Sequence, residues 1–162
     1  MASHAKPESI EGGCLCGSIR YTVNFPRDHD FDNAVTTCQC EQCRKGTGVL
    51  FLRAHKVPMS AVTFQSQSTL KNYHATPGYA RGICTNCGSF LSWREEDSEF
   101  ISLAVGCFDN KYLTKYGRVL AASQKHVWCG EEIPGVTDHL QGNKWRHDNE
   151  GEGAELLSSS KP

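Results

Sequence analysis

The sequence predicts an all-β protein with few or no helices, and three observations support this. Short runs that are rich in β-branched and aromatic residues alternate polar and apolar positions, as half-buried strands do. These runs recur about every ten residues and are separated by Gly and Pro, which is typical of antiparallel sheets joined by turns. No long stretch keeps the 3.6-residue apolar period of an amphipathic helix.

The expected strands follow one another through the body of the chain. They cover residues 18–23, 49–52, 62–64, 70–73, 90–93 and 100–105. One helical turn is expected at residues 112–116. The length of 162 residues suits one domain, which we place at residues 10–142. Residues 1–9 and 143–162 are polar, and we expect both segments to be flexible tails.

Composition narrows the cellular setting and the partners. The chain has 17 basic and 18 acidic residues and a formal net charge of −1, so neither nucleic acid nor a membrane is expected as a partner. The first residues contain no apolar stretch resembling a signal peptide, which predicts a cytoplasmic protein. In that compartment nine cysteines are expected to stay reduced, and metal binding is their best use.

Two separated cysteine pairs predict a structural zinc. Cys14 and Cys16 stand two positions apart, so both sulfurs can point to one side of an extended segment. Cys84 and Cys87 form a Cys-x-x-Cys turn. A structural zinc takes four ligands in a tetrahedron, and these two pairs supply four thiolates. We expect this site to be closed and unreactive.

The middle cluster predicts a second zinc with different chemistry. Cys38, Cys40 and Cys43 give three thiolates within six residues, which leaves the fourth zinc position open for water or substrate. Such a site suits catalysis on a thiolate or a carbonyl. Arg44 and Lys45 follow directly, and we expect them to offset the negative site and attract an anionic substrate, unless they are only solvated surface charges.

The fourth position has alternative occupants. Cys107, Cys129 or His126 could close the second site, which would make it another structural zinc. Each of these residues could equally be a buried structural side chain. The pocket walls cannot be derived from spacing. Their candidates, each of which could instead be a core or surface residue, are Phe51, Arg53, His55, Trp93, Phe108, Tyr112 and Tyr116.

The three cysteine motifs together resemble a known family. The segments 13–17, 38–44 and 82–89 are similar to the three motifs of the glutathione-dependent formaldehyde-activating enzymes, a family that includes centromere protein V. Residues 103–109 and 123–128 resemble its later segments. The chain departs from the family pattern at Gln39, where many members have His, and in the closing segment, where many members end with a Trp shortly after the His and this chain reads Cys-Gly-Glu-Glu-Ile-Pro at residues 129–134.

The resemblance implies a fold of several coiled antiparallel β-sheets around a structural zinc at the first and third motifs, and a catalytic zinc at the middle motif. It also implies a carbon–sulfur lyase that acts on a glutathione adduct of an aldehyde. Two other functions stay open: a different zinc-dependent reaction of a small metabolite at the same site, and a non-enzymatic zinc-stabilised binding module. Neither the substrate nor the oligomeric state can be predicted from the sequence.

Overall fold

The structure is a computed structural model that describes residues 5–160. Two α-helices and twelve strands make up most of it, together with three short 3-10 turns at Met59–Ala61, Val105–Cys107 and Cys129–Glu131. The elements are β1 (Ser9–Gly13), β2 (Arg20–Asn24), β3 (Val35–Cys38), α1 (Glu41–Thr47), β4 (Leu52–Pro58), β5 (Val62–Ser66), β6 (Leu70–Thr76), β7 (Tyr79–Cys84), β8 (Phe90–Glu95), β9 (Phe100–Ala104), α2 (Asn110–Ala121), β10 (Lys125–Val127), β11 (Asn143–Trp145) and β12 (Leu156–Ser159). The prediction of a mainly β fold with few helices is confirmed.

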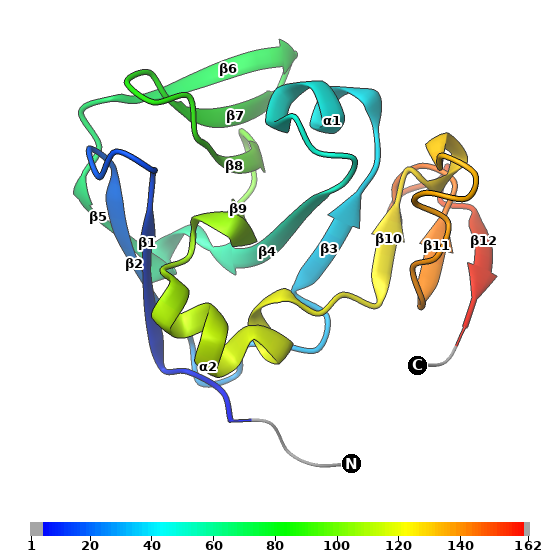
Figure 1. Ribbon diagram of the computed structural model, residues 1–162, viewed down its shortest axis with the longest axis horizontal. Helices are drawn as coiled ribbons and strands as arrows, with labels where there is room; N and C mark the ends of the chain where they lie inside the picture. The colour runs from blue at the N-terminus through cyan, green and yellow to red at the C-terminus, as the bar shows by residue number, and fades with distance from the viewer. Residues whose placement is uncertain (1–4, 161–162) are drawn as a thin grey trace.

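The strands form two sheets. The smaller has the order β1-β2-β5 and is antiparallel throughout. The larger has nine strands in the order β12-β11-β10-β3-β4-β9-β8-β7-β6. Most of its pairings are antiparallel, but β10 runs parallel to both neighbours, β3 and β11. Figure 1 shows β10, β11 and β12 grouped at one side of the molecule, away from the smaller sheet.

The main core lies where the smaller sheet, the larger sheet and α2 meet. Tyr21 and Val23 of β2, Leu91 of β8 and Leu103 of β9 are almost completely buried there, and α2 adds Leu120. A second, smaller apolar cluster surrounds the middle cysteines. The main core contains both Cys14 and Cys84, so it joins the first cysteine pair to the later Cys-x-x-Cys pair.

Both helices differ from the sequence prediction. The turn expected at residues 112–116 is part of the twelve-residue helix α2. Its buried or half-buried side chains are Tyr112, Leu113, Tyr116, Val119 and Leu120. Their spacing is close to the helical period, so the statement that no such period exists was wrong for this segment. The helix α1 was not predicted, because its seven residues present only Cys43 to the interior.

Two further predictions were wrong in part. The strand expected at residues 49–52 begins only at Leu52, because residues 49–51 form a bend in which Val49 and Leu50 are exposed. The segment 143–162 was expected to be flexible, yet in its described part, residues 143–160, β11 and β12 extend the larger sheet. Main-chain hydrogen bonds such as Asn143 N–H to the Gln124 carbonyl (2.8 Å) hold this segment, and composition does not report them. Residues 161–162 of that predicted tail lie outside the described residues.

The prediction of a flexible amino-terminal tail at residues 1–9 can be compared with the structure only from residue 5 onward. Residues 1–4 of the tail predicted at 1–9 lie outside the described residues. Pro7 is buried, and β1 begins at Ser9. Within residues 5–160, no helix combines the length and apolarity needed to cross a membrane.

Candidate metal centres

The structure brings Cys14, Cys16, Cys84 and Cys87 together, and their four sulfur atoms all lie within 4.8 Å of one another. The Sγ–Sγ distance is 3.5 Å between Cys14 and Cys16 and 3.8 Å between Cys16 and Cys84. A tetrahedral zinc with Zn–S bonds of about 2.3 Å separates its sulfurs by about 3.8 Å. These four side chains are therefore already arranged as a closed metal site needs. We call this group the four-cysteine centre.

Two tight turns position these sulfurs. Gly17 and Gly88 both adopt positive φ angles, 78° and 77°, which glycine reaches without steric cost. In each turn the glycine N–H donates back to a cysteine carbonyl, Cys14 in one case (3.1 Å) and Cys84 in the other (2.8 Å). The Asn86 side-chain amide also donates to the Cys16 sulfur at 3.2 Å. The donors of the protein thus stabilise thiolate sulfur at this position.

The middle cysteines form a second group, which we call the three-cysteine centre. Cys38 ends β3, Cys40 precedes α1 as its N-cap, and Cys43 lies in the first turn of α1. Their three sulfur atoms lie within 4.8 Å of one another. The Cys43 N–H donates to the Cys40 sulfur at 3.3 Å, so the start of the helix fixes the sulfur geometry. Within residues 5–160, no further Cys, His, Asp or Glu joins this cluster.

The three proposed fourth ligands have other contacts. Cys107 packs beside the three-cysteine centre, but its S–H donates to the Phe90 carbonyl at 3.2 Å. Cys129 donates to the carbonyl of His126 at 3.4 Å. The His126 Nε2 lies 2.8 Å from the Gln141 carbonyl. The part of the chain that the structure describes therefore leaves the three-cysteine centre one ligand short of a tetrahedron.

The cysteines of the three-cysteine centre differ from Cys107 and Cys129 in the acidity of their thiols. Hydrogen bonds from Cys38 and then Cys43 lower the pKa of Cys40, so one thiolate forms readily inside the three-cysteine centre. The pKa of Cys38 rises, chiefly because its thiol donates to Cys40. Burial raises the pKa of both Cys107 and Cys129 to about 11, so these two thiols stay protonated near neutral pH.

Arg44 and Lys45 have partners within the chain. The Arg44 guanidinium donates to the main-chain carbonyls of Gln39 (2.8 Å) and Glu131 (3.0 Å), which ties α1 to the segment after β10. Lys45 is mostly exposed and pairs with Glu41 one helical turn away at 2.7 Å. These contacts give both residues local structural roles and offer no support for the predicted binding of an anionic substrate.

Arg81 is a residue near the three-cysteine centre that sequence reasoning missed. It lies on β7 with only 8% of its surface exposed, and its Nη2 donates to the Gln42 side chain of α1. Its Nη1 is buried without a hydrogen-bond partner, and no carboxylate pairs with Arg81 within residues 5–160. The pKa of Cys43 is raised to about 12 overall. Hydrogen bonding with Cys38 lowers it, whereas hydrogen bonding with Cys40 and burial raise it, and the positive charge of Arg81 acts to lower it.

A buried cation without a carboxylate needs another negative partner. Three thiolates on a zinc ion carry a formal charge of about −1, and Arg81 is placed to balance it. The only signal in the sequence is weak: an arginine stands three positions before Cys84, in a strand whose other residues are apolar or small. Spacing alone does not say that this strand faces α1.

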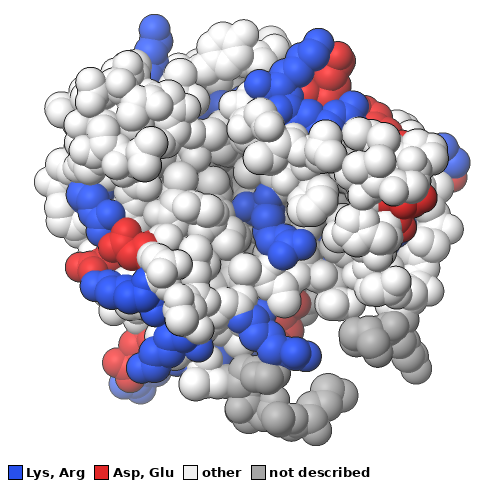
Figure 2. Space-filling view, viewed as in Figure 1, with Lys and Arg blue, Asp and Glu red and all other residues white. Residues whose placement is uncertain are grey.

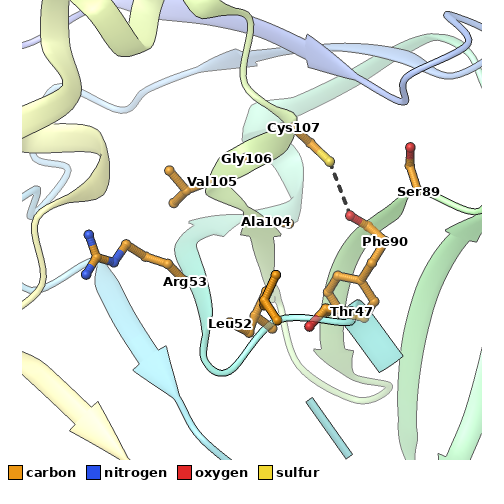
Figure 3. A pocket seen from close by; sticks show the side chains of 10 residues that line it. Thr47, Leu52, Arg53, Ser89, Phe90, Ala104, Val105, Gly106 and Cys107 are labelled. Atoms are coloured by element: carbon orange, nitrogen blue, oxygen red, sulfur yellow. Dashed lines mark hydrogen bonds between the residues drawn. The ribbon is translucent and has the colours of Figure 1, made fainter. Parts of the chain in front are cut away.

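A pocket of about 370 Å³ borders the apolar cluster around the three-cysteine centre, although none of the three cysteines lines it. Figure 3 shows its lining residues, with Arg53 on one side and Cys107 and Ser89 on the other. Leu52, Phe90 and Ala104 belong both to the pocket wall and to the apolar cluster that packs around the three cysteines. The volume is within the range of small-molecule sites. Of the pocket candidates taken from the sequence, Arg53 alone lines it.

Comparisons with known proteins agree with this geometry. The family model described as "glutathione-dependent formaldehyde-activating enzyme" matches residues 9–131, more than half of the chain. A crystal structure of a protein from Rhodobacter sphaeroides is similar in fold, with a TM-score of 0.52 at 20% sequence identity; the alignment covers 62% of this chain and 89% of that chain. A search of curated proteins finds no match.

Proposed function

Because the chain belongs to the glutathione-dependent formaldehyde-activating enzyme family, we propose that it is a zinc-dependent carbon–sulfur lyase acting on a glutathione adduct of an aldehyde. The observation that carries this proposal is the three-cysteine centre, where three sulfurs converge near a pocket and no fourth ligand from residues 5–160 completes the set. We place the reaction at Cys38, Cys40 and Cys43. The four-cysteine centre would hold a second, structural zinc.

The donor sets fit zinc on chemical grounds. Thiolates are soft ligands, and clusters of three or four of them select zinc among the common divalent ions. Four sulfurs give a saturated site, while three leave one position for a substrate atom. A zinc ion bound by the three-cysteine centre would lower the pKa of a substrate thiol and polarise a carbonyl oxygen.

The residues of the chain supply the rest of the site. The fixed start of α1 holds the Cys40 and Cys43 sulfurs at one point, and β3 brings Cys38 to them. The apolar wall of Leu52, Phe90 and Ala104 limits water around that point, which strengthens electrostatic interactions there. Holding a thiol and an aldehyde together in this pocket favours their reaction through proximity.

The proposed reaction needs no oxidant or reductant. In one direction the thiol loses its proton, its sulfur forms a bond to the carbonyl carbon, and the carbonyl oxygen takes up a proton to give a hydroxymethyl thioether. In the reverse direction the carbon–sulfur bond breaks and the aldehyde leaves. All nine cysteines are free thiols, which favours a reducing compartment such as the cytoplasm as the place of action.

The test compares Cys40→Ser with Cys129→Ser, which removes a buried thiol outside the pocket that we assign no role in metal binding. Each protein is assayed for zinc content and for turnover of glutathione with formaldehyde. We expect Cys40→Ser to retain one zinc per chain and to lose turnover, and Cys129→Ser to retain two zincs and turnover. Full turnover by folded Cys40→Ser carrying a single zinc would contradict the proposal.

A further inference from the structure

Three polar side chains form a row across neighbouring strands of the larger sheet. Thr37 of β3 stands directly opposite Arg53 of β4 and directly beside His126 of β10. Residues at matched positions of adjacent strands project from the same face of a sheet. The positive charge of Arg53 acts on His126, where it adds to the larger effect of burial in lowering the histidine pKa. We call these three residues the polar row.

Each residue of the polar row has one buried polar atom without a hydrogen-bond partner in the described part of the chain. Thr37 and His126 are 0% and 1% exposed. Within residues 5–160, the Thr37 hydroxyl, the His126 Nδ1 and the Arg53 Nε are all buried without a partner. Buried polar atoms of native proteins are almost always paired with protein or with ordered water. Three such orphans on one face are best explained by a bound polar molecule.

The position of the proton on His126 determines which hydrogen-bonding groups of a ligand the polar row can bind. Its Nε2 faces the Gln141 carbonyl at 2.8 Å, so Nε2 carries the proton and Nδ1 is an acceptor. The Arg53 Nε–H is a donor, and the Thr37 hydroxyl can act as either. One water molecule that donates to His126 and accepts from Arg53 would satisfy this set. Such a water anchors the inner side of the Arg53 guanidinium and leaves its two terminal nitrogens free.

Arg53 has no negative partner of its own. Within the described chain its side chain forms no salt bridge, and its guanidinium lies over the Phe51 ring at 5.8 Å from the ring centroid. Lys144, which continues the same row on β11, differs because it pairs with Glu132 at 2.8 Å. A half-buried guanidinium without a carboxylate can bind the carboxylate of a ligand in the two-pronged geometry that arginine favours.

The position of Arg53 connects this feature to the substrate pocket. Among residues 5–160, Arg53 is the only charged residue in the pocket lining, and the remaining wall is mostly apolar. Figure 3 shows its side chain on the side of the pocket opposite Cys107 and Ser89. Figure 2 shows that Lys and Arg side chains on this molecular face are separated by wide uncharged surface. A ligand that fills the pocket therefore meets a single fixed positive charge.

We propose that Arg53 binds a carboxylate of the substrate, with Thr37 and His126 as positioning residues that hold its guanidinium. This inference rests on the proposed function, since it takes the pocket near the three-cysteine centre as the substrate site. The substrate class is then a thiol adduct that carries a free carboxylate, as a glutathione adduct does. Esterified or decarboxylated thiols of similar size are poor ligands.

The test uses S-methylglutathione, which has both carboxylates but no free thiol, and its diethyl ester. Calorimetry measures the binding of each to the zinc-loaded protein. We expect the acid to bind at least about tenfold more tightly than the ester, because the charge-assisted pair is lost on esterification. Arg53→Gln should abolish this preference and Arg53→Lys should restore part of it. Thr37→Val should weaken binding of the acid and leave the ester unchanged.

Lys56→Gln is the matched control, because Lys56 is an exposed cation of the same strand and does not line the pocket. It should keep the full preference for the acid. Equal binding of acid and ester by the wild type, absence of any binding, or an unchanged preference in Arg53→Gln would each overturn the inference. Failure of the proposed function looks different, because the Arg53-dependent preference would persist in a protein that turns over no glutathione adduct.

Discussion

Replacing Cys87 by serine should destabilise the fold much more than replacing Cys43 by serine, although each change removes one sulfur from a metal centre. The four-cysteine centre joins the turn after β1 to the end of β7, so its metal connects distant parts of the chain. The three-cysteine centre joins only the end of β3 to the adjoining helix α1. Losing the second metal should therefore loosen one short helix and leave the core intact.

The lengths of the closed loops set the size of the difference. Cys16 and Cys84 are 68 positions apart, whereas Cys38 and Cys43 are five apart in the sequence. The entropy of loop closure grows with the logarithm of length, so the long closure contributes about 2 kcal/mol more to the free energy of unfolding. For a chain of this size, that corresponds to a melting temperature lower by roughly 4–8 °C.

Differential scanning calorimetry of both variants, with zinc counted in each sample, measures this difference. If Cys87→Ser does not yield folded protein, the wild type is titrated with a zinc chelator. The first zinc to leave should then cause little unfolding and the second should coincide with loss of the fold. An equal or larger fall in melting temperature for Cys43→Ser, with one zinc lost from each variant, would refute the assignment of structural and reactive roles.

Three other predictions test separate parts of the account. Arg81→Met should weaken zinc binding at the three-cysteine centre by at least about tenfold, as loss of a residue that supports the ligands commonly does. Gln42→Ala should weaken zinc binding less, because this variant keeps the charge of Arg81. Competition with a chromophoric chelator measures both affinities, and equal losses would show that Arg81 only anchors α1. Burial lowers the pKa of His55 to about 4 from its ordinary 6.5, so between these values the unfolded chain binds a proton that the folded chain does not. The free energy of unfolding should therefore fall by about 2 kcal/mol between pH 7.5 and 5. Urea unfolding should show a smaller fall for His55→Gln, and equal falls would exclude His55 as a cause. A chain ending at residue 142 lacks β11 and β12 and should melt at a lower temperature than the full chain, whereas an unchanged melting temperature would show that these strands add nothing to the fold.

The β character of the fold was predictable because alternating runs leave a direct mark on the sequence. Five of the six expected strands overlap β2, β5, β6, β8 and β9 in full or large part. The weaker elements left no such mark. Helix α1 has a single buried side chain, and β11 and β12 are held by main-chain hydrogen bonds rather than by apolar burial. Reasoning from composition therefore misread both regions.

The grouping of the cysteines was also predictable, since spacing restricts which sulfurs can meet. The structure brings together the same four and the same three that the spacing suggested. Charged residues near the site were less accessible to sequence reasoning. Arg44 and Lys45 lie next to Cys43 in the chain but pair locally, whereas Arg81 and Arg53 reach the site through strand pairing. Contacts of that kind depend on register, which no local pattern in the sequence reports.

The number of sulfur atoms around zinc tests the central claim most directly. X-ray absorption of the zinc-loaded protein reports the average coordination of both ions. One saturated site and one site with a free position predict about 3.5 sulfurs per zinc, rising toward four when glutathione binds. Four sulfurs per zinc before any thiol is added would mean that another cysteine completes the three-cysteine centre, and the proposed site of reaction would then be structural.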